Sequence, residues 1–117
     1  MMKNIPPIDL KDALERTGDD MDFLLELLEM YENDFTVKAD SLETALAGFD
    51  FEALREIGHY LKGSSANLGL GPLREAAFML ERAGTEKNPQ AALEGMARLK
   101  RGFEDLKRYL RETPELS

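Results

Sequence analysis

Apolar residues along most of this chain recur at spacings of three and four, the period of one face of an α-helix. No useful length of sequence alternates apolar and polar residues with the period of two that a half-buried strand requires. We therefore predict an all-α fold without a sheet. The two most regular stripes are Leu24, Leu28, Tyr31, Phe35, Leu42, Ala45 and Phe49, and then Ala92, Met96, Leu99, Phe103, Leu106 and Leu110.

Residues that favour helix starts and ends divide the chain into five helices. Asp and Asn favour the position before a helix, proline its first turn, and glycine its end. A fourth helix has its inner face at Leu73, Ala76, Ala77 and Leu80. In chain order we expect a first helix over residues 10–16, capped by Asp9, and a long second helix from Asp19 or Asp20 to about Ala47, stopped by Gly48. The third is expected over residues 51–68, capped by Asp50, and the fourth over residues 72–84, from Pro72 to Gly84. The last begins at Asn88-Pro89 and ends before Pro114.

Four substantial amphipathic helices with short connections predict an antiparallel up-down-up-down four-helix bundle. The short extra N-terminal helix is expected to cover one end of it. A length of 117 residues fits a single domain over residues 1–117. Such a bundle by itself says nothing about function.

Composition excludes several classes of function. The formal net charge of −8 argues against a nucleic-acid or anionic-membrane binder. With no cysteine and one histidine, disulfides and thiolate metal sites are excluded, and a structural zinc site is not expected. Residues 1–7 lack the apolar segment of a signal peptide, and no apolar run approaches the ~20 residues that span a bilayer. We expect a cytoplasmic protein.

The single histidine, His59, lies in a run that weakens its own helix. Gly58 and Gly63 each cost about 1 kcal/mol relative to alanine in a helix interior, and Ser64 and Ser65 are mediocre helix formers. A stretch that opposes local propensity without an evident structural gain is where function is expected.

His59 is predicted to point away from the core. The inner stripe of its helix is Leu54, Ile57, Leu61 and Leu68, and each residue turns ~100° around the axis. An ordinary solvated surface histidine is the plain alternative reading. The expected neighbours on the outer face are Arg55, Glu56, Lys62, Gly63 and Ala66.

The residues around His59 suit a phosphoryl acceptor. A neutral imidazole is a nucleophile at pH 7, a nearby lysine can stabilise an anion on the ring, and Gly63 leaves an approach path open. Taken singly, Lys62 also fits a solvated helix lysine, and Gly63 a close helix contact. Gly58 and Ser65 are expected to let helices pack tightly. The combination favours phosphoryl transfer completed by a partner.

The run from His59 to Gly69, His-Tyr-Leu-Lys-Gly-Ser-Ser-Ala-Asn-Leu-Gly, resembles the signature of histidine-containing phosphotransfer (HPt) domains. The resemblance extends over the whole chain, because that family also folds as a four-helix bundle with an extra N-terminal helix. It implies a carrier in a two-component phosphorelay. Such a protein accepts a phosphoryl group on Nε2 from a receiver aspartyl-phosphate and passes it to the aspartate of another receiver, often a response regulator.

The resemblance also implies roles for individual residues. His59 would be the phosphoacceptor, Lys62 would neutralise the phosphoryl oxygens, and Gly63 would leave room for the receiver. Partners would be response-regulator receiver domains, with a hybrid histidine kinase as a further candidate. The carrier itself would need no cofactor, metal or ATP site, because the receiver supplies Mg²⁺ and the acidic pocket. Candidate docking residues are Arg55, Tyr60, Lys62, Ala66 and Asn67, with Met79 as either a docking or a core residue.

The chain departs from the family at one point. Some members use a glutamine on the following helix to hydrogen-bond the phosphohistidine. Here that region offers Glu75 and Glu81, and a carboxylate would repel the phosphoryl group unless it were turned away. The role of a residue on this helix is therefore open.

Three alternatives stand beside the carrier. An adaptor could dock on a kinase or receiver without carrying phosphate, although it would need neither His59 nor Lys62. The chain could be the phosphoacceptor part of a larger sensor kinase; its starting methionines and short tail favour a free-standing chain, weakly. An enzyme with its own active site is the least favoured, since one histidine supports no catalytic grouping. We expect a monomer, because a second copy over His59 would block access.

Overall fold

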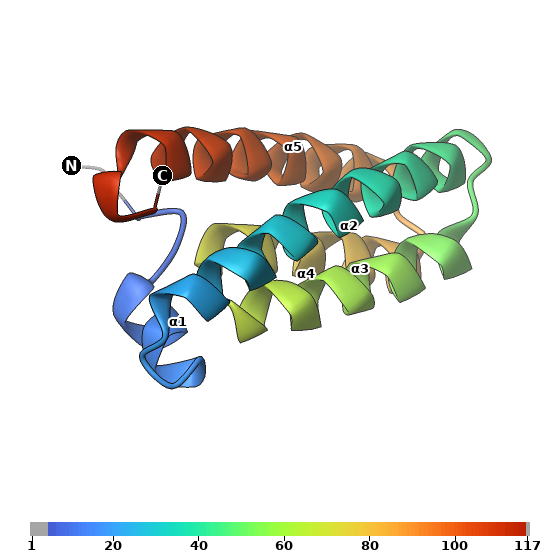
Figure 1. Cartoon of the computed structure of the whole chain (residues 1–117). Coiled ribbons are helices and arrows are strands. Elements are labelled where there is room, and N and C mark those ends of the chain that lie inside the picture. The colour runs from blue at the N-terminus through green and yellow to red at the C-terminus, as the bar shows by residue number, and fades with distance from the viewer. Residues whose placement is uncertain (1–4, 117) are drawn as a thin grey trace.

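The computed structural model describes residues 5–116. The outer ends of the predicted domain, residues 1–4 and 117, lie outside the described residues. Much of the N-terminal segment that was considered as a signal peptide lies outside them too. The all-α prediction is confirmed, because these residues form helices and no strand (Figure 1). The elements are α1 (Leu10–Arg16), α2 (Met21–Ala47), α3 (Phe51–Asn67), α4 (Gly71–Glu86), α5 (Pro89–Glu112) and the 3₁₀ turn η1 (Pro114–Leu116).

Side-chain caps begin four of the five helices. Asp9, Asp20, Asp50 and Asn88 each accept a hydrogen bond at 3.0–3.1 Å from the backbone amide three residues later. Such a cap satisfies one of the amides that a helix leaves unpaired at its start. Of the two candidates for α2, Asp20 is therefore the cap, and Asp19 lies before it with a positive φ of 59°.

The four long helices lie lengthwise beside one another, with α1 at the end of the bundle where α5 ends (Figure 1). Helix α3 packs most extensively against α4, α4 packs against α5, and α2 contacts both α3 and α5. The connections, residues 48–50, 68–70 and 87–88, are short. The segment before α1 is tied to the α3–α4 turn by the Asp9 amide, which donates to the Gly69 carbonyl at 2.8 Å. Helix α1 therefore covers one end, as predicted.

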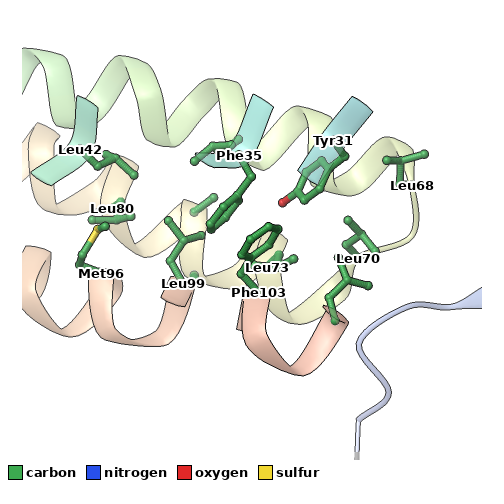
Figure 2. Packing of buried hydrophobic residues seen from close by; sticks show 14 of the residues in the cluster. Tyr31, Phe35, Leu42, Leu68, Leu70, Leu73, Leu80, Met96, Leu99 and Phe103 are labelled. Atoms are coloured by element: carbon green, nitrogen blue, oxygen red, sulfur yellow. The ribbon is translucent and has the colours of Figure 1, made fainter. Parts of the chain in front are cut away.

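The core lies between these helices and consists mainly of leucine and alanine (Figure 2). Phe35 of α2 stacks on Phe103 of α5, with ring centroids 3.9 Å apart. Tyr31 is also buried, and its hydroxyl shares a 2.8 Å hydrogen bond with the buried hydroxyl of Ser65. That bond satisfies both polar groups, as burial requires. The predicted inner positions of α2 from Leu24 to Ala45 are buried.

The prediction that Phe49 continues the inner stripe of α2 is wrong. The helix ends at Ala47, and Phe49 takes a positive φ of 54° in the turn that follows. Its side chain is 64% exposed. The helical period therefore stops applying before residue 49, and the side chain points away from the core.

The prediction that Gly84 ends the fourth helix is also wrong. Helix α4 continues to Glu86, and Lys87 takes the left-handed position that follows. Gly84 is buried where α4 meets α3, and a Cβ atom there would lie 2.5 Å from the Arg55 backbone nitrogen. The packing of α4 on α3 therefore requires glycine at position 84, and the place of Gly84 in the sequence does not reveal this requirement.

Among the described residues, none of the helices is both long enough and apolar enough to cross a membrane.

Candidate functional site

Helix α3 presents His59 outward, as its apolar spacing predicted. Leu61 on the inner face is completely buried, whereas the His59 side chain is 68% exposed. Its Nδ1 atom lies 3.1 Å from Oε2 of Glu81 on α4. Within residues 5–116 the structure gives Nε2 no hydrogen-bond partner. The ring is therefore held by one nitrogen while the other faces outward.

Glu81 is the residue of this site that sequence reasoning left unassigned. Its second oxygen, Oε1, lies 2.6 Å from the Lys62 ammonium, so one carboxylate joins His59 and Lys62. The pKa of Glu81 is lowered, chiefly by Lys62; burial opposes this lowering, and the hydrogen bond with His59 adds to it to a lesser extent. Glu81 is therefore ionised at neutral pH. The expectation that a carboxylate here would have to be turned away holds in one respect: it contacts Nδ1, not Nε2.

Lys62 is more enclosed than a free surface lysine. Its side chain is 27% exposed, and its ammonium lies 5.2 Å from the centre of the Phe78 ring on α4. The ammonium is thus held by the Glu81 carboxylate and the face of an aromatic ring, both of which attract cations. This arrangement places a positive charge beside the histidine.

The close approach of α3 and α4 makes these contacts possible. A Cβ atom at Gly58 would lie 2.6 Å from the Glu81 backbone nitrogen, so only glycine lets the two helices come so near. The packing role expected for Gly58 is confirmed. His59 follows Gly58 directly, so the contact that brings the helices together also places Glu81 next to the imidazole.

Gly63 differs from Gly58. A Cβ atom at Gly63 would meet no described atom within 4 Å, and the residue is exposed. The alternative that Gly63 serves a close helix contact is therefore wrong, and open space lies beside this position, one turn after His59.

The predicted docking residues do not share one surface. Tyr60 and Asn67 line a groove of about 750 Å³ between α2 and α3, together with Phe23 and Met30 of α2. Ala66 lines a different hollow, formed with the α3–α4 turn and the segment before α1. These two groups of residues therefore face different neighbours.

Two of the candidates are held by ionic groups. Arg55 pairs with Glu52 on its own helix, which raises the pKa of Arg55 and lowers that of Glu52. The Tyr60 hydroxyl donates to Asp34 of α2 at 2.6 Å, and this bond raises the pKa of the phenol. Lys38 also lies 4.5 Å from the centre of the Tyr60 ring. Tyr60 is thus oriented toward α2 although it is 47% exposed.

The remaining candidates on α4 lie elsewhere. Met79 is half-buried beside Gly95 of α5, but it is not among the residues that form the hydrophobic core or pack against it. Glu75 pairs with Arg74 at 2.8 Å and is exposed. Of the two acidic residues considered on this helix, only Glu81 contacts His59. The described residues contain no group of three or more histidine, aspartate and glutamate side chains placed to hold a metal ion.

Comparison with known proteins points to one family. The family model described as "Hpt domain" matches residues 26–109. No curated protein sequence matches the chain. Among solved structures, the crystal structure of histidine-containing phosphotransfer protein B (HptB) from Pseudomonas aeruginosa PAO1 is similar, with a TM-score of 0.80 at 24% identity, over 94% of this chain and 100% of that chain. This likeness shows a shared fold.

Proposed function

The chain belongs to the Hpt domain family, and from this premise we propose that it is a phosphorelay carrier whose phosphoacceptor is His59. It accepts a phosphoryl group from the aspartyl-phosphate of a receiver domain and passes it to the aspartate of another receiver. The observation that carries the proposal is the state of the imidazole: an exposed ring held at Nδ1 by Glu81, with Nε2 facing outward.

The chemistry follows from that arrangement. The Nε2 lone pair attacks phosphorus, the bond between phosphorus and the receiver carboxylate oxygen breaks, and that oxygen keeps the electron pair. The reverse sequence donates the group to a second receiver. Phosphoryl transfer depends mainly on alignment and charge stabilisation. The receiver brings Mg²⁺ and its acidic pocket, and Lys62 supplies a positive charge on this side.

The open space at Gly63 supports a close approach of the receiver. A partner that delivers a phosphoryl group to Nε2 must place its own loops against the helix beside His59. A residue with a long side chain at position 63 would stand in that space, whereas glycine leaves it clear. We assign Gly63 to clearance for this reason.

The surface of this chain on which the receiver docks includes the groove between α2 and α3, next to His59. Tyr60, which follows His59, and Asn67 share their groove with apolar α2 residues, of which Phe23 is 46% and Met30 65% exposed. Arg55 and Ala66 stay candidates for docking, but both lie outside this groove. An apolar patch rimmed by polar groups is typical of a protein interface.

Other parts of the prediction belong to this proposal. We propose a single domain over residues 1–117 with the up-down-up-down order of helices, which the short connections and the contacts between successive helices support. We further propose a monomeric, cytoplasmic carrier that needs no cofactor of its own, is not itself an enzyme, and has a hybrid histidine kinase as a candidate partner.

The test is incubation with a phosphorylated receiver domain and Mg²⁺, comparing the wild-type chain with His59→Gln. We expect acid-labile, base-stable label on the wild type and none on the variant. Absence of label on the wild type with every member of a panel of receivers, while circular dichroism shows a folded helical protein, would favour the adaptor that docks without carrying phosphate.

A further inference from the structure

The Glu81 carboxylate holds two functional side chains of the neighbouring helix at once. Oε2 lies 3.1 Å from His59 Nδ1, and Oε1 lies 2.6 Å from Lys62 Nζ. Its side chain is only 19% exposed, against 68% for His59. The anchor of the imidazole is therefore more enclosed than the imidazole itself, and its backbone is fixed against Gly58.

The protonation state of the ring follows from the chemistry of this pair. An ionised carboxylate can only accept hydrogen bonds. The 3.1 Å contact is therefore a hydrogen bond when Nδ1 carries the proton. In a neutral imidazole the lone pair then lies on Nε2, the exposed nitrogen. A free imidazole divides itself between two tautomers, whereas this geometry selects the one that can attack phosphorus.

We propose that Glu81 is the positioning residue of phosphoryl transfer at His59, because it fixes the proton on Nδ1 and carries the counter-charge while the ring is a cation. This inference rests on the proposed function. When Nε2 attacks, the ring keeps its Nδ1 proton and gains a positive charge, which the carboxylate faces directly. When the phosphoryl group leaves, the electron pair of the phosphorus–nitrogen bond returns to Nε2. A neutral imidazole is then left, and no proton has moved.

The carboxylate acts among several other charges. From α3, the Lys62 ammonium pairs with it directly, and Arg55 interacts with it at longer range. Glu56 lies on α3 near Arg55, and Arg82 follows Glu81 on α4, where it pairs with Glu86. On α2, Asp34 and Lys38 contact Tyr60, the residue that follows His59. Glu81 is therefore the carboxylate in direct contact with the ring among the described residues.

The first readout needs no phosphate. ¹⁵N NMR of the His59 ring reports which nitrogen carries the proton, in the wild type, Glu81→Gln and Glu81→Ala. We expect the Nδ1–H tautomer in the wild type and a mixture in Glu81→Ala. Glu75→Gln is the matched control, because Glu75 lies on the same helix but pairs with Arg74, and it should resemble the wild type. An Nε2–H tautomer in the wild type, or a Glu81→Ala variant with the same tautomer as the wild type, would overturn the inference.

The second readout is the rate of transfer between His59 and a receiver as a function of pH. Loss of a hydrogen bond to a charged group predicts a fall of roughly tenfold or more in Glu81→Ala. Glu81→Gln keeps an acceptor for Nδ1 but lacks the charge that holds the proton on the phosphorylated ring. The ratio of wild-type to Glu81→Gln donation rates should therefore grow from about pH 6 to about pH 9. A ratio that stays flat across this range would reject the counter-charge role.

These two readouts separate the inference from the function on which it rests. If no receiver phosphorylates the wild-type chain, the proposed function has failed and the transfer role of Glu81 fails with it. The tautomer measurement would still show whether Glu81 fixes the ring. If the wild type is phosphorylated normally and Glu81→Gln and Glu81→Ala match it in both readouts, the function stands and the positioning role is rejected.

Discussion

Gly58 of α3 lies directly against the backbone of Glu81 on α4, so closely that a Cβ atom at Gly58 would stand 2.6 Å from the Glu81 amide nitrogen. The next residue along α3 is His59, whose Nδ1 meets the Glu81 carboxylate. One contact between two helices therefore fixes both the spacing of the backbones and the setting of the imidazole. The glycines at positions 58 and 63, which look alike in the sequence, have opposite surroundings.

Substitution of the two glycines by alanine should change stability in opposite directions. Gly58→Ala forces backbone atoms of two helices apart and should lower the free energy of unfolding by about 1–3 kcal/mol. Gly63→Ala meets no described atom within 4 Å and should raise it by up to about 1 kcal/mol through helix propensity. Urea unfolding followed by circular dichroism measures both. Equal effects would show that the α3–α4 contact is less tight than described.

A long side chain at position 63 should separate folding from transfer. Gly63→Gln is expected to be neutral or stabilising for the helix, because glutamine is a better helix former than glycine. It should slow transfer from a phosphorylated receiver, because the side chain occupies the space beside His59. Rapid-quench transfer kinetics measures the effect, with Gly63→Ala as the smaller control. Unchanged rates for the glutamine variant would reject the clearance role.

His59→Gln should fold like the wild type. The side chain is 68% exposed, and exposed side chains contribute little to stability, so we expect a change within about 1 kcal/mol. Thermal unfolding followed by circular dichroism tests this. A large loss of helix content would mean that the imidazole supports the bundle, and the missing label in the variant could then no longer be assigned to a lost acceptor.

Removal of the Tyr31 hydroxyl should destabilise the core. Tyr31→Phe leaves the buried Ser65 hydroxyl without its 2.8 Å partner, at a cost of about 1–2 kcal/mol. Burial also raises the pKa of Tyr31 far above its ordinary value, so the phenol stays protonated through the neutral range. The double variant Tyr31→Phe, Ser65→Ala should recover part of the loss. A double-mutant cycle by urea unfolding measures the coupling, and additive losses would speak against the bond.

The contribution of Glu81 to stability should disappear in acid. The pKa of this carboxyl is lowered in the folded chain from its reference value of 4.5, first by Lys62. The ionised form is therefore favoured by folding. Its stabilising effect is full above the unfolded-state pKa and is lost as pH falls through the lower folded-state pKa. The stability difference between wild type and Glu81→Gln, about 1 kcal/mol at neutral pH, should shrink over that range. A difference independent of pH would exclude the ion pair as its source.

Local features of the fold were predictable because their causes are local. A cap such as Asp50 bonds an amide three residues away, and the apolar period of α5 repeats over a single helix. The same local logic placed His59 on the outer face. It failed at Phe49, because the helix ends at Ala47, two residues before the stripe would have continued. It failed also at Gly84, which was predicted as a helix end but lies inside α4, in contact with the backbone of α3.

By itself, the sequence determined the helices, their starts, the outward direction of His59 and the family signature around it, because each of these depends on residues within a few turns of one another. The tertiary structure alone decided which acidic residue of α4 serves the site. Glu75 and Glu81 both lie outside the buried apolar stripe of one amphipathic helix, and no local rule distinguishes them. The choice was made by the close packing of α3 on α4 at Gly58, which brings Glu81 to Nδ1 and Lys62 across a separation of about twenty residues in the chain.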